Sequence, residues 1–264
     1  MQKPVISLLQ MAALPGQVEA NRQKALRLVE QAARQGAQVA LLPELWDTDY
    51  FFPQARELAQ EHQEKTKTLL AWAAREYKLY LVAGSVAQWR EGKLYNTMYV
   101  FDPAGREVAA YSKIHLFGIM EEDKYLAPGE RRTMWEAPFG KAGLMICYDL
   151  RFPELARTYA LEGARILFVP AAWAYPRDKH WSMLLRARAI ENQLYVVGTN
   201  RAGRSGDFEF PGRSAIVDPW GETVLEADEQ EGVYTESIDM GKVEEIRRRI
   251  PVFQDRRTEF YNIK

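Results

Sequence analysis

Hydrophobic positions along the chain fall into short apolar runs that alternate with longer amphipathic stretches. The apolar runs predict strands over residues 4–11, 38–44, 79–87, 94–102, 107–113, 142–147, 165–171, 194–200 and 233–239, and a hairpin over 214–226. Stretches with a helical apolar period predict helices over 19–35, 54–76, 153–162, 181–192 and 240–249. Gly36 and Gly163 stand where two of these helices end, a position that favours glycine. Strands that alternate with helices, together with two hairpins, predict an α/β fold of mixed sheets covered by helices.

Length and composition narrow the class of protein. The chain has 264 residues, of which 47% are hydrophobic and 27% charged, which is typical of a globular protein with a large core. Since no linker or low-complexity tract interrupts the pattern, we expect residues 1–264 to form a single domain. The net charge of −1 gives no electrostatic reason to expect nucleic acid or a membrane surface as a partner.

The cysteine count and the apolar runs bear on the compartment. One cysteine, Cys147, cannot form an internal disulfide, and this favours a reducing compartment. The apolar run at the N-terminus is too short for a signal peptide, and no stretch approaches the roughly 18–20 apolar residues of a membrane span. We therefore expect a cytoplasmic protein.

Three residues with charged or reactive side chains follow three of the predicted strands. Glu44 ends "ALLPE", Lys113 ends "AAYSK" and Cys147 ends "GLMIC". Functional sites in open α/β sheets gather beyond the carboxyl ends of the strands. A lone cysteine is more often a small buried hydrophobe, and a charged residue at a strand end is usually solvated. The coincidence of all three favours a functional site.

These three residue types together can carry out acyl transfer. The helix that opens near Pro153 is expected to direct its free N–H groups toward Cys147 and so to favour the thiolate. A nearby carboxylate can take the thiol proton, and a nearby ammonium can stabilise the negative charge of a tetrahedral intermediate.

The sequence around these residues resembles the nitrilase superfamily of carbon–nitrogen hydrolases. The segments "LLPELW", "YSKIHLF" and "ICYDLRFPEL" are similar in order and spacing to the family's Glu, Lys and Cys motifs. "MEEDKYLAPGE" resembles the segment with a second glutamate, which corresponds to Glu122, with Glu121 as the alternative. Residues 180–200, 212–222 and 246–257 are most similar to the omega-amidase branch.

This resemblance implies an α-β-β-α sandwich and a homodimer or higher oligomer. It also implies an amidase that hydrolyses a small amide through a thioester on Cys147, with α-keto acid monoamides as substrates. Glu44 would then be the general base, while Lys113 and the backbone N–H of Tyr148 would hold the oxyanion. Glu122 would position Lys113 and the substrate. No metal or organic cofactor is expected.

Cations and aromatic residues near Cys147 are candidates for the substrate pocket. A substrate carboxylate needs a cation or N–H donors, which Arg151, Arg177 or Lys179 could supply. Alternatively, Arg151 pairs with Asp149 or Glu154 as part of the scaffold. The aromatic candidates for the pocket wall are Tyr50, Phe51, Trp173 and Tyr175.

Other functions remain open at this stage. A histidine could serve Cys147, as in papain-like enzymes, but His62 lies in a charged helix and His115 suits a supporting hydrogen bond. His180 opens a helix and either lies beside its cap or faces the pocket. The reaction could be that of a nitrilase or an N-carbamoyl-amide hydrolase of the same superfamily. A non-catalytic binding protein on the same scaffold is disfavoured by the complete set of Glu, Lys and Cys.

Overall fold

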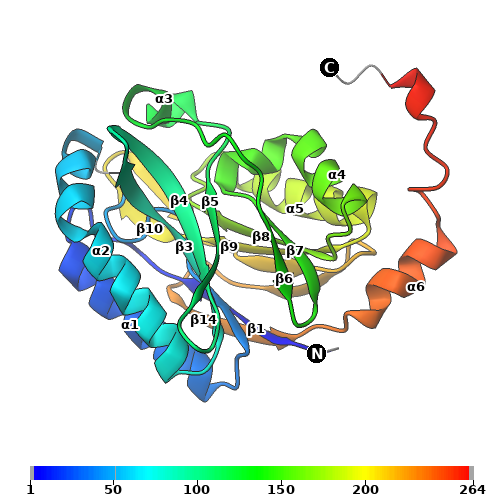
Figure 1. Ribbon diagram of the computed structural model, residues 1–264, viewed down its shortest axis with the longest axis horizontal. Helices are drawn as coiled ribbons and strands as arrows, with labels where there is room; N and C mark the ends of the chain where they lie inside the picture. Colours follow the sequence, from blue (N-terminus) through cyan, green and yellow to red (C-terminus); the bar gives the residue numbers. More distant parts are fainter. Residues whose placement is uncertain (1–2, 51, 262–264) are drawn as a thin grey trace.

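The computed structural model describes residues 3–50 and 52–261 and contains two six-stranded sheets that pack face to face (Figure 1). The first sheet has the order β14-β1-β2-β3-β4-β5, formed by β1 Val5–Gln10, β2 Val39–Leu41, β3 Tyr80–Arg90, β4 Lys93–Phe101, β5 Glu107–Ser112 and β14 Gly232–Ser237. The second has the order β13-β12-β9-β8-β7-β6, formed by β6 Met134–Ala137, β7 Gly140–Leu144, β8 Ile166–Ala171, β9 Tyr195–Asn200, β12 Ala215–Val217 and β13 Thr223–Glu226. A separate two-stranded ribbon joins β10 Ala202–Ser205 to β11 Phe208–Pro211.

Helices cover the outer face of each sheet. The α-helices are α1 Val18–Arg34, α2 Phe52–Glu76, α3 Glu122–Tyr125, α4 Pro153–Leu161, α5 Asp178–Asn192 and α6 Gly241–Arg249, and the 3₁₀ helices are η1 Gly118–Met120, η2 Cys147–Arg151 and η3 Thr258–Phe260. Helices α1 and α2 lie on the first sheet, and α4 and α5 lie on the second (Figure 1). This arrangement confirms the predicted α-β-β-α sandwich.

The strands at the centre of each sheet are parallel, as expected for buried strands with continuous apolar sequences. In the first sheet β1, β2 and β3 run parallel, and in the second β7, β8 and β9 do so. The outer strands are antiparallel, so both sheets are mixed, as predicted. The carboxyl ends of the central strands therefore lie together at one edge of each sheet.

The core has separate layers, because successive side chains of a strand point to opposite faces. Ile6 and Leu8 of β1 pack between the two sheets with Phe168 of β8, whereas Leu9 packs outward with Leu28 of α1. All five side chains are buried. The amphipathic pattern of α1 arises from this contact with the outer face of the first sheet.

The observed elements differ from the predicted ones at a few places. The strand predicted over 142–147 is paired over Gly140–Leu144, and the backbone turns away at Cys147, which has a φ of +45°. The helix predicted over 181–192 begins earlier, at Asp178. The short elements β6, β10, β11 and α3 were not predicted, since their sequences carry little apolar periodicity.

No helix within residues 3–50 and 52–261 is long and apolar enough to cross a membrane. After α6, the chain leaves the body of the sandwich and extends along its side toward the C-terminus (Figure 1). This segment exposes Ile250, Phe260 and Tyr261, which are large apolar side chains.

Candidate active site

The structure brings the residues predicted from three strand ends to one place between the two sheets. Glu44 follows β2 and Lys113 follows β5, both in the first sheet, whereas Cys147 begins η2 beyond β7 of the second. All three side chains are buried, and so is Glu122 at the start of α3. The site therefore lies where the ends of the two sheets face each other.

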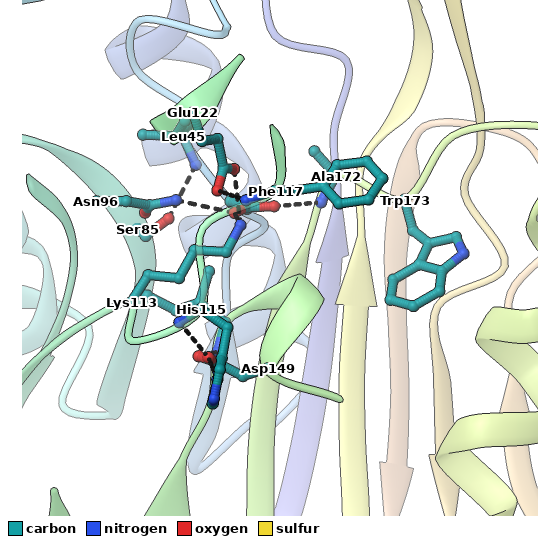
Figure 2. A network of polar contacts seen from close by, with 12 residues as sticks. Leu45, Ser85, Asn96, Lys113, His115, Phe117, Glu122, Asp149, Ala172 and Trp173 are labelled. Carbon is teal, nitrogen blue, oxygen red and sulfur yellow. Dashed lines mark hydrogen bonds and ion pairs between the residues drawn. The ribbon is translucent and has the colours of Figure 1, made fainter. Parts of the chain in front are cut away.

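Lys113 is the centre of a buried ion-pair cluster. Its Nζ atom lies 2.7 Å from Oε1 of Glu44 and 2.7 Å from Oε1 of Glu122 (Figure 2). Burial acts to lower the pKa of Lys113, but the Glu122 and Glu44 carboxylates outweigh burial and raise that pKa above its usual value. Lys113 is therefore an ammonium at neutral pH.

Each carboxylate has further donors that fix its orientation. Oε1 of Glu44 accepts a hydrogen bond from Asn96 Nδ2 at 2.8 Å, and its Oε2 accepts one from the Ala172 N–H at 2.9 Å (Figure 2). Glu122 accepts hydrogen bonds from the Tyr50 hydroxyl at 3.0 Å and from the Phe117 N–H at 2.9 Å. Both carboxylates are thus held rigidly.

Of the two candidates for the second glutamate, the structure places Glu122 at Lys113. Glu121 has a left-handed backbone and an exposed side chain that pairs with Lys124. Burial raises the pKa of Glu122, an effect that Lys113 opposes.

A bulge in β3 holds the turn that carries Glu44. Gly84 has a φ of +58°, and a Cβ atom there would lie 2.0 Å from the Pro43 oxygen, so only glycine fits. The Ser85 hydroxyl accepts a hydrogen bond from the Leu45 N–H at 3.0 Å (Figure 2). The register between β3 and β4 shifts at the same place, between Val82 and Ser85.

The nucleophile candidate sits on a strained turn. With a φ of +45°, Cys147 occupies the left-handed region that costs a non-glycine residue on the order of 1–3 kcal/mol. The expectation that the site favours the thiolate is wrong. Burial raises the pKa of the Cys147 thiol well above its usual value, and Glu44 adds to this, whereas Lys113 acts in the opposite direction. Helix α4 begins at Pro153, as predicted, but its N-terminus does not offset the effect of burial on the thiol.

A small hollow opens beside Cys147. It is lined by Phe117, Cys147, Tyr148, Arg151, Ala172, Trp173, Ala174 and Arg177, and it encloses about 240 Å³, including space open to solvent. The hollow is small and opens to solvent directly beside the thiol.

Two cations reach this hollow. The guanidinium of Arg151 lies 4.7 Å from the centre of the Trp173 ring, and its Nη2 is 3.2 Å from His180 Nδ1. Arg151 thus pairs with neither of the acidic residues considered from the sequence. Arg177 lies over the Phe117 ring at 5.4 Å.

The other candidates differ in their placement. Tyr50 lies at the catalytic cluster, where it donates to Glu122 and where burial and the charges of Glu44 and Glu122 raise its pKa. Tyr175 faces outward, with its hydroxyl 3.3 Å from Glu229. Lys179 and His180 are exposed, although His180 contacts Arg151. Phe51 lies outside the described residues.

Neither of the other two histidines is bound to Cys147. His115 places Nδ1 2.7 Å from Oδ1 of Asp149, which agrees with the predicted supporting hydrogen bond (Figure 2). His62 lies in α2, on the outside of the first sheet. Among the residues that the structure describes, no group of three or more His, Cys, Asp or Glu side chains is arranged to hold a metal ion.

Sequence reasoning missed several groups at this site, among them Asn96 and the backbone N–H groups of Phe117 and Ala172. Of these groups, Asn96 could have been recognised from the sequence, because it is a polar residue on a strand that is otherwise largely apolar.

Comparisons with known proteins agree with this geometry. The family model for carbon–nitrogen hydrolases matches residues 5–248. The 2-oxoglutaramate amidase of Bacillus subtilis is 40% identical over 259 residues, which cover 98% of this chain and 100% of that protein. Omega-amidase NIT2-A of Xenopus laevis is 37% identical over 276 residues, which cover 100% of this chain and 99% of that protein.

Solved structures share the fold along the whole length. Nit3 of Saccharomyces cerevisiae, a member of branch 10 of the nitrilase superfamily, is 31% identical with a TM-score of 0.90, and the match covers 97% of each chain. A carbon–nitrogen hydrolase from Helicobacter pylori G27 is 30% identical with a TM-score of 0.94, and the match covers 99% of this chain and 97% of that one.

Proposed function

Since the chain belongs to the carbon–nitrogen hydrolase family and is a hydrolase of non-peptide carbon–nitrogen bonds, we propose that it is an omega-amidase-like enzyme for α-keto acid monoamides. The observation that carries this proposal is the buried Glu44–Lys113–Glu122 cluster beside Cys147, together with a small hollow at Cys147 that Arg151 and Arg177 line. Residues 1–264 then form a single carbon–nitrogen hydrolase domain.

The first half of the proposed reaction forms a thioester. Sγ of Cys147 attacks the amide carbonyl, and its proton passes to Glu44. Because burial and Glu44 raise the pKa of the thiol, proton transfer must accompany the attack. The Lys113 ammonium and the backbone N–H of Tyr148 stabilise the tetrahedral oxyanion. When the intermediate collapses, the C–N bond breaks and Glu44 returns its proton to the departing ammonia.

The second half hydrolyses the thioester. Glu44 takes a proton from water, the resulting hydroxide attacks the thioester carbonyl, and the same two donors hold the second oxyanion. The C–S bond then breaks, the acid product leaves and the thiol recovers its proton. Glu122 transfers no proton in this scheme but holds the Lys113 ammonium in place through the contact of 2.7 Å.

The charge of the hollow supports a substrate with a carboxylate. Arg151 and Arg177 both line it, and a guanidinium binds a carboxylate through paired N–H donors. Trp173 gives the hollow a flat apolar wall beneath Arg151. The monoamide of α-ketoglutarate combines a terminal amide with a carboxylate at the other end, and the substrate named for the Bacillus subtilis relative is of this kind.

An ammonia-release screen tests the proposal. The purified protein is incubated with α-ketoglutarate monoamide, an uncharged aliphatic amide of equal length, a nitrile and an N-carbamoyl compound. We expect the highest kcat/KM for the keto acid monoamide. If the uncharged amide is hydrolysed equally well, the proposed substrate class is wrong, whereas a preference for the nitrile or carbamoyl compound supports the alternative activities of the superfamily.

We also propose that the protein is a homodimer or a higher homo-oligomer. The helical layer over the second sheet exposes Leu161 of α4 and Met183 and Ile190 of α5, which are large apolar side chains that a partner subunit would cover. Light scattering at micromolar concentration should give at least twice the 30.4 kDa mass of one chain. The mass of a single chain would contradict the proposal.

A further inference from the structure

Asp149 is a fully buried carboxylate two residues after Cys147, and the proposed reaction gives it no role. Its Oδ2 accepts hydrogen bonds from the Tyr111 hydroxyl at 2.7 Å and from the Ile146 N–H at 2.9 Å. Its Oδ1 lies 3.0 Å from the backbone nitrogen of His115 and 2.7 Å from Nδ1 of the same residue (Figure 2). Every polar contact of this carboxylate is thus directed to a neighbour of a reacting group.

The partners of Asp149 lie on both sides of Lys113. Tyr111 precedes Lys113 by two residues at the end of β5, and His115 follows Lys113 by two residues. Asp149 itself belongs to η2, which begins at Cys147. The Asp149 carboxylate therefore links the turn that contains Cys147 to the chain before and after Lys113, the proposed oxyanion-binding cation.

Asp149 also holds the strained backbone at the nucleophile. Ile146, directly before Cys147, donates its N–H to Oδ2 of Asp149, and the Asp149 N–H donates to the Ile146 oxygen at 3.0 Å. These two bonds close the turn in which Cys147 has its positive φ. The direction of the Tyr148 N–H, the second proposed oxyanion donor, is set by the same turn.

The contacts require an acceptor with two oxygens. Burial and the Asp149 charge raise the pKa of Tyr111 well above its usual value, so its hydroxyl keeps its proton and donates it. The N–H groups of Ile146 and His115 are donors as well, and His115 Nδ1 donates when it carries the proton. His115 is held flat against Phe152, with the ring centres 3.6 Å apart and the ring planes at 9°. An amide at position 149 would place its own NH₂ against one of these donors.

We infer that Asp149 is a positioning residue for the amidase reaction, which sets the placement of Cys147 and the Tyr148 N–H relative to Lys113 through Tyr111, His115 and Ile146. This inference rests on the proposed function. Loosening the link moves Cys147 and the Tyr148 N–H together away from Lys113, whereas Trp173 and Arg177, which lie outside η2, keep their place in the hollow. Such a change lowers kcat and leaves KM nearly constant, because the affected contacts form with the transition state.

The sharpest test compares two buried tyrosines. Tyr111→Phe removes the hydroxyl that binds Asp149. The control, Tyr159→Phe, removes an equally buried hydroxyl that donates to the Leu144 oxygen at 2.8 Å, at the end of the same strand that leads to Cys147. We expect kcat of Tyr111→Phe to fall about 10- to 100-fold at nearly constant KM, as for a misplaced reacting group, and kcat of Tyr159→Phe to stay within about threefold of the wild type. Equal values of kcat in the two variants would overturn the inference.

A second pair of variants, both at His115, separates loss of the hydrogen bond to Asp149 from a general effect on folding. His115→Asn retains an N–H donor close to the position of Nδ1, whereas His115→Leu does not. We expect the Asn variant to recover most of the kcat that the Leu variant loses, although both lose the imidazole ring. A Leu variant as active as the Asn variant would contradict a role for this hydrogen bond.

A readout without substrate separates this inference from the proposed function. The rate at which iodoacetamide alkylates Cys147, followed by mass spectrometry, depends on how the thiol faces Glu44 and not on the substrate. Tyr111→Phe should slow this alkylation several-fold relative to Tyr159→Phe. Equal or faster alkylation overturns the positioning role, whereas a wild-type protein that hydrolyses none of the amides in the screen overturns the proposed function.

Discussion

The Nζ atom of Lys113 lies 2.7 Å from Oε1 of Glu44, and neither side chain is exposed to solvent. A buried ion pair of this kind adds little to stability, because the cost of removing both charges from water offsets their attraction. Glu122 supplies a second negative charge at the same distance, which leaves the cluster with one more carboxylate than ammonium. A cation held this firmly is placed for chemistry, and it is available to an oxyanion that forms beside it.

The first prediction concerns the nucleophile. Cys147→Ser should lose about 10³-fold or more in kcat, because the alcohol is harder to deprotonate than the thiol in a site that already disfavours the anion. Ammonia release measures the loss. The unfolding midpoint should stay close to that of the wild type, since the two side chains have nearly the same size. A Ser variant with wild-type turnover would show that the reaction needs no thiol.

The two glutamates at Lys113 should differ in their effect. Glu44→Gln removes the general base and should lower kcat about 10²- to 10⁴-fold. Glu122→Gln keeps an oxygen for the Phe117 N–H but turns its NH₂ toward the Lys113 ammonium, so it should lower kcat by displacing Lys113, and by less than Glu44→Gln does. Single-turnover measurements on both variants distinguish the roles. Equal losses would mean that Glu122 also transfers a proton.

The protonation state of Cys147 can be measured directly, because the chain contains no other cysteine. Burial and Glu44 raise the thiol pKa, so the neutral form should persist through and above neutral pH. We expect no rise in thiolate absorbance at 240 nm between pH 6 and pH 8.5 relative to Cys147→Ser. A titration centred near pH 6 or 7 would be the result for a stabilised thiolate, and it would contradict the concerted proton transfer proposed here.

Substrate selection should depend on Arg151. Loss of a charged hydrogen bond costs about 1.5–3 kcal/mol, so Arg151→Met should lower kcat/KM for the keto acid monoamide roughly 10- to 100-fold. The value for an uncharged amide of equal length should change little. Lys179→Met is the matched control, because Lys179 is a nearby exposed cation that does not line the hollow. Equal losses on both amides would place Arg151 in the scaffold and not in carboxylate binding.

Asp47 should make stability depend on pH. Burial raises its pKa from 3.8 to about 7, an effect that Arg22 opposes. Between about pH 4 and pH 7 the unfolded chain has lost a proton that the folded chain keeps, so this group lowers the free energy of unfolding as pH rises. The penalty is constant above about pH 7, where it amounts to roughly 4 kcal/mol.

Asp47→Asn cannot ionise, so its stability relative to the wild type should increase from pH 5 to pH 7 and then level off. Urea unfolding at pH 5, 6, 7 and 8 measures this. Asp102→Asn is the control of opposite sign. Burial acts to raise the pKa of Asp102, but the hydrogen bonds from Arg106 and Ala104 lower it overall. The free energy of unfolding that Asp102→Asn loses relative to the wild type should therefore be nearly constant between pH 5 and pH 8. A relative stability of Asp47→Asn that does not change with pH would contradict the raised pKa.

The positions where the central strands end were predictable, because buried strands appear in the sequence as short apolar runs. Glu44, Lys113 and Cys147 each interrupt an apolar run, and the carboxyl ends of strands meet in an α/β sheet. Their contact was not predictable from the pattern alone, because it depends on how two sheets face each other. The strand-end pattern suggested the grouping, and the resemblance to a known family supported it and supplied Glu122, which no strand pattern marks.

What the sequence did not predict depends on long-range geometry. The Asn96 side chain reaches Glu44 because of where Asn96 lies along β4, at the point where its backbone oxygen accepts a hydrogen bond from the Lys113 N–H. This strand register is set by the whole sheet. The turn at Cys147 has a positive φ without a glycine to signal it, so the preceding strand was predicted too long. Asp149 was considered only as a partner for Arg151, whereas two of its donors, Tyr111 and His115, come from segments more than thirty residues away.

The two sheets carry different catalytic groups of the proposed reaction. Glu44 and Lys113 stand at the edge of the first sheet, and Cys147 and the Ala172 N–H stand at the facing edge of the second. A slide of one sheet against the other would part the base from the nucleophile while every hydrogen bond within each sheet stayed intact. Circular dichroism would not register that slide, but hydrolysis would cease. On gentle heating, the turnover rate should therefore decline at a lower temperature than the far-ultraviolet spectrum, and it would report the alignment of the sandwich itself.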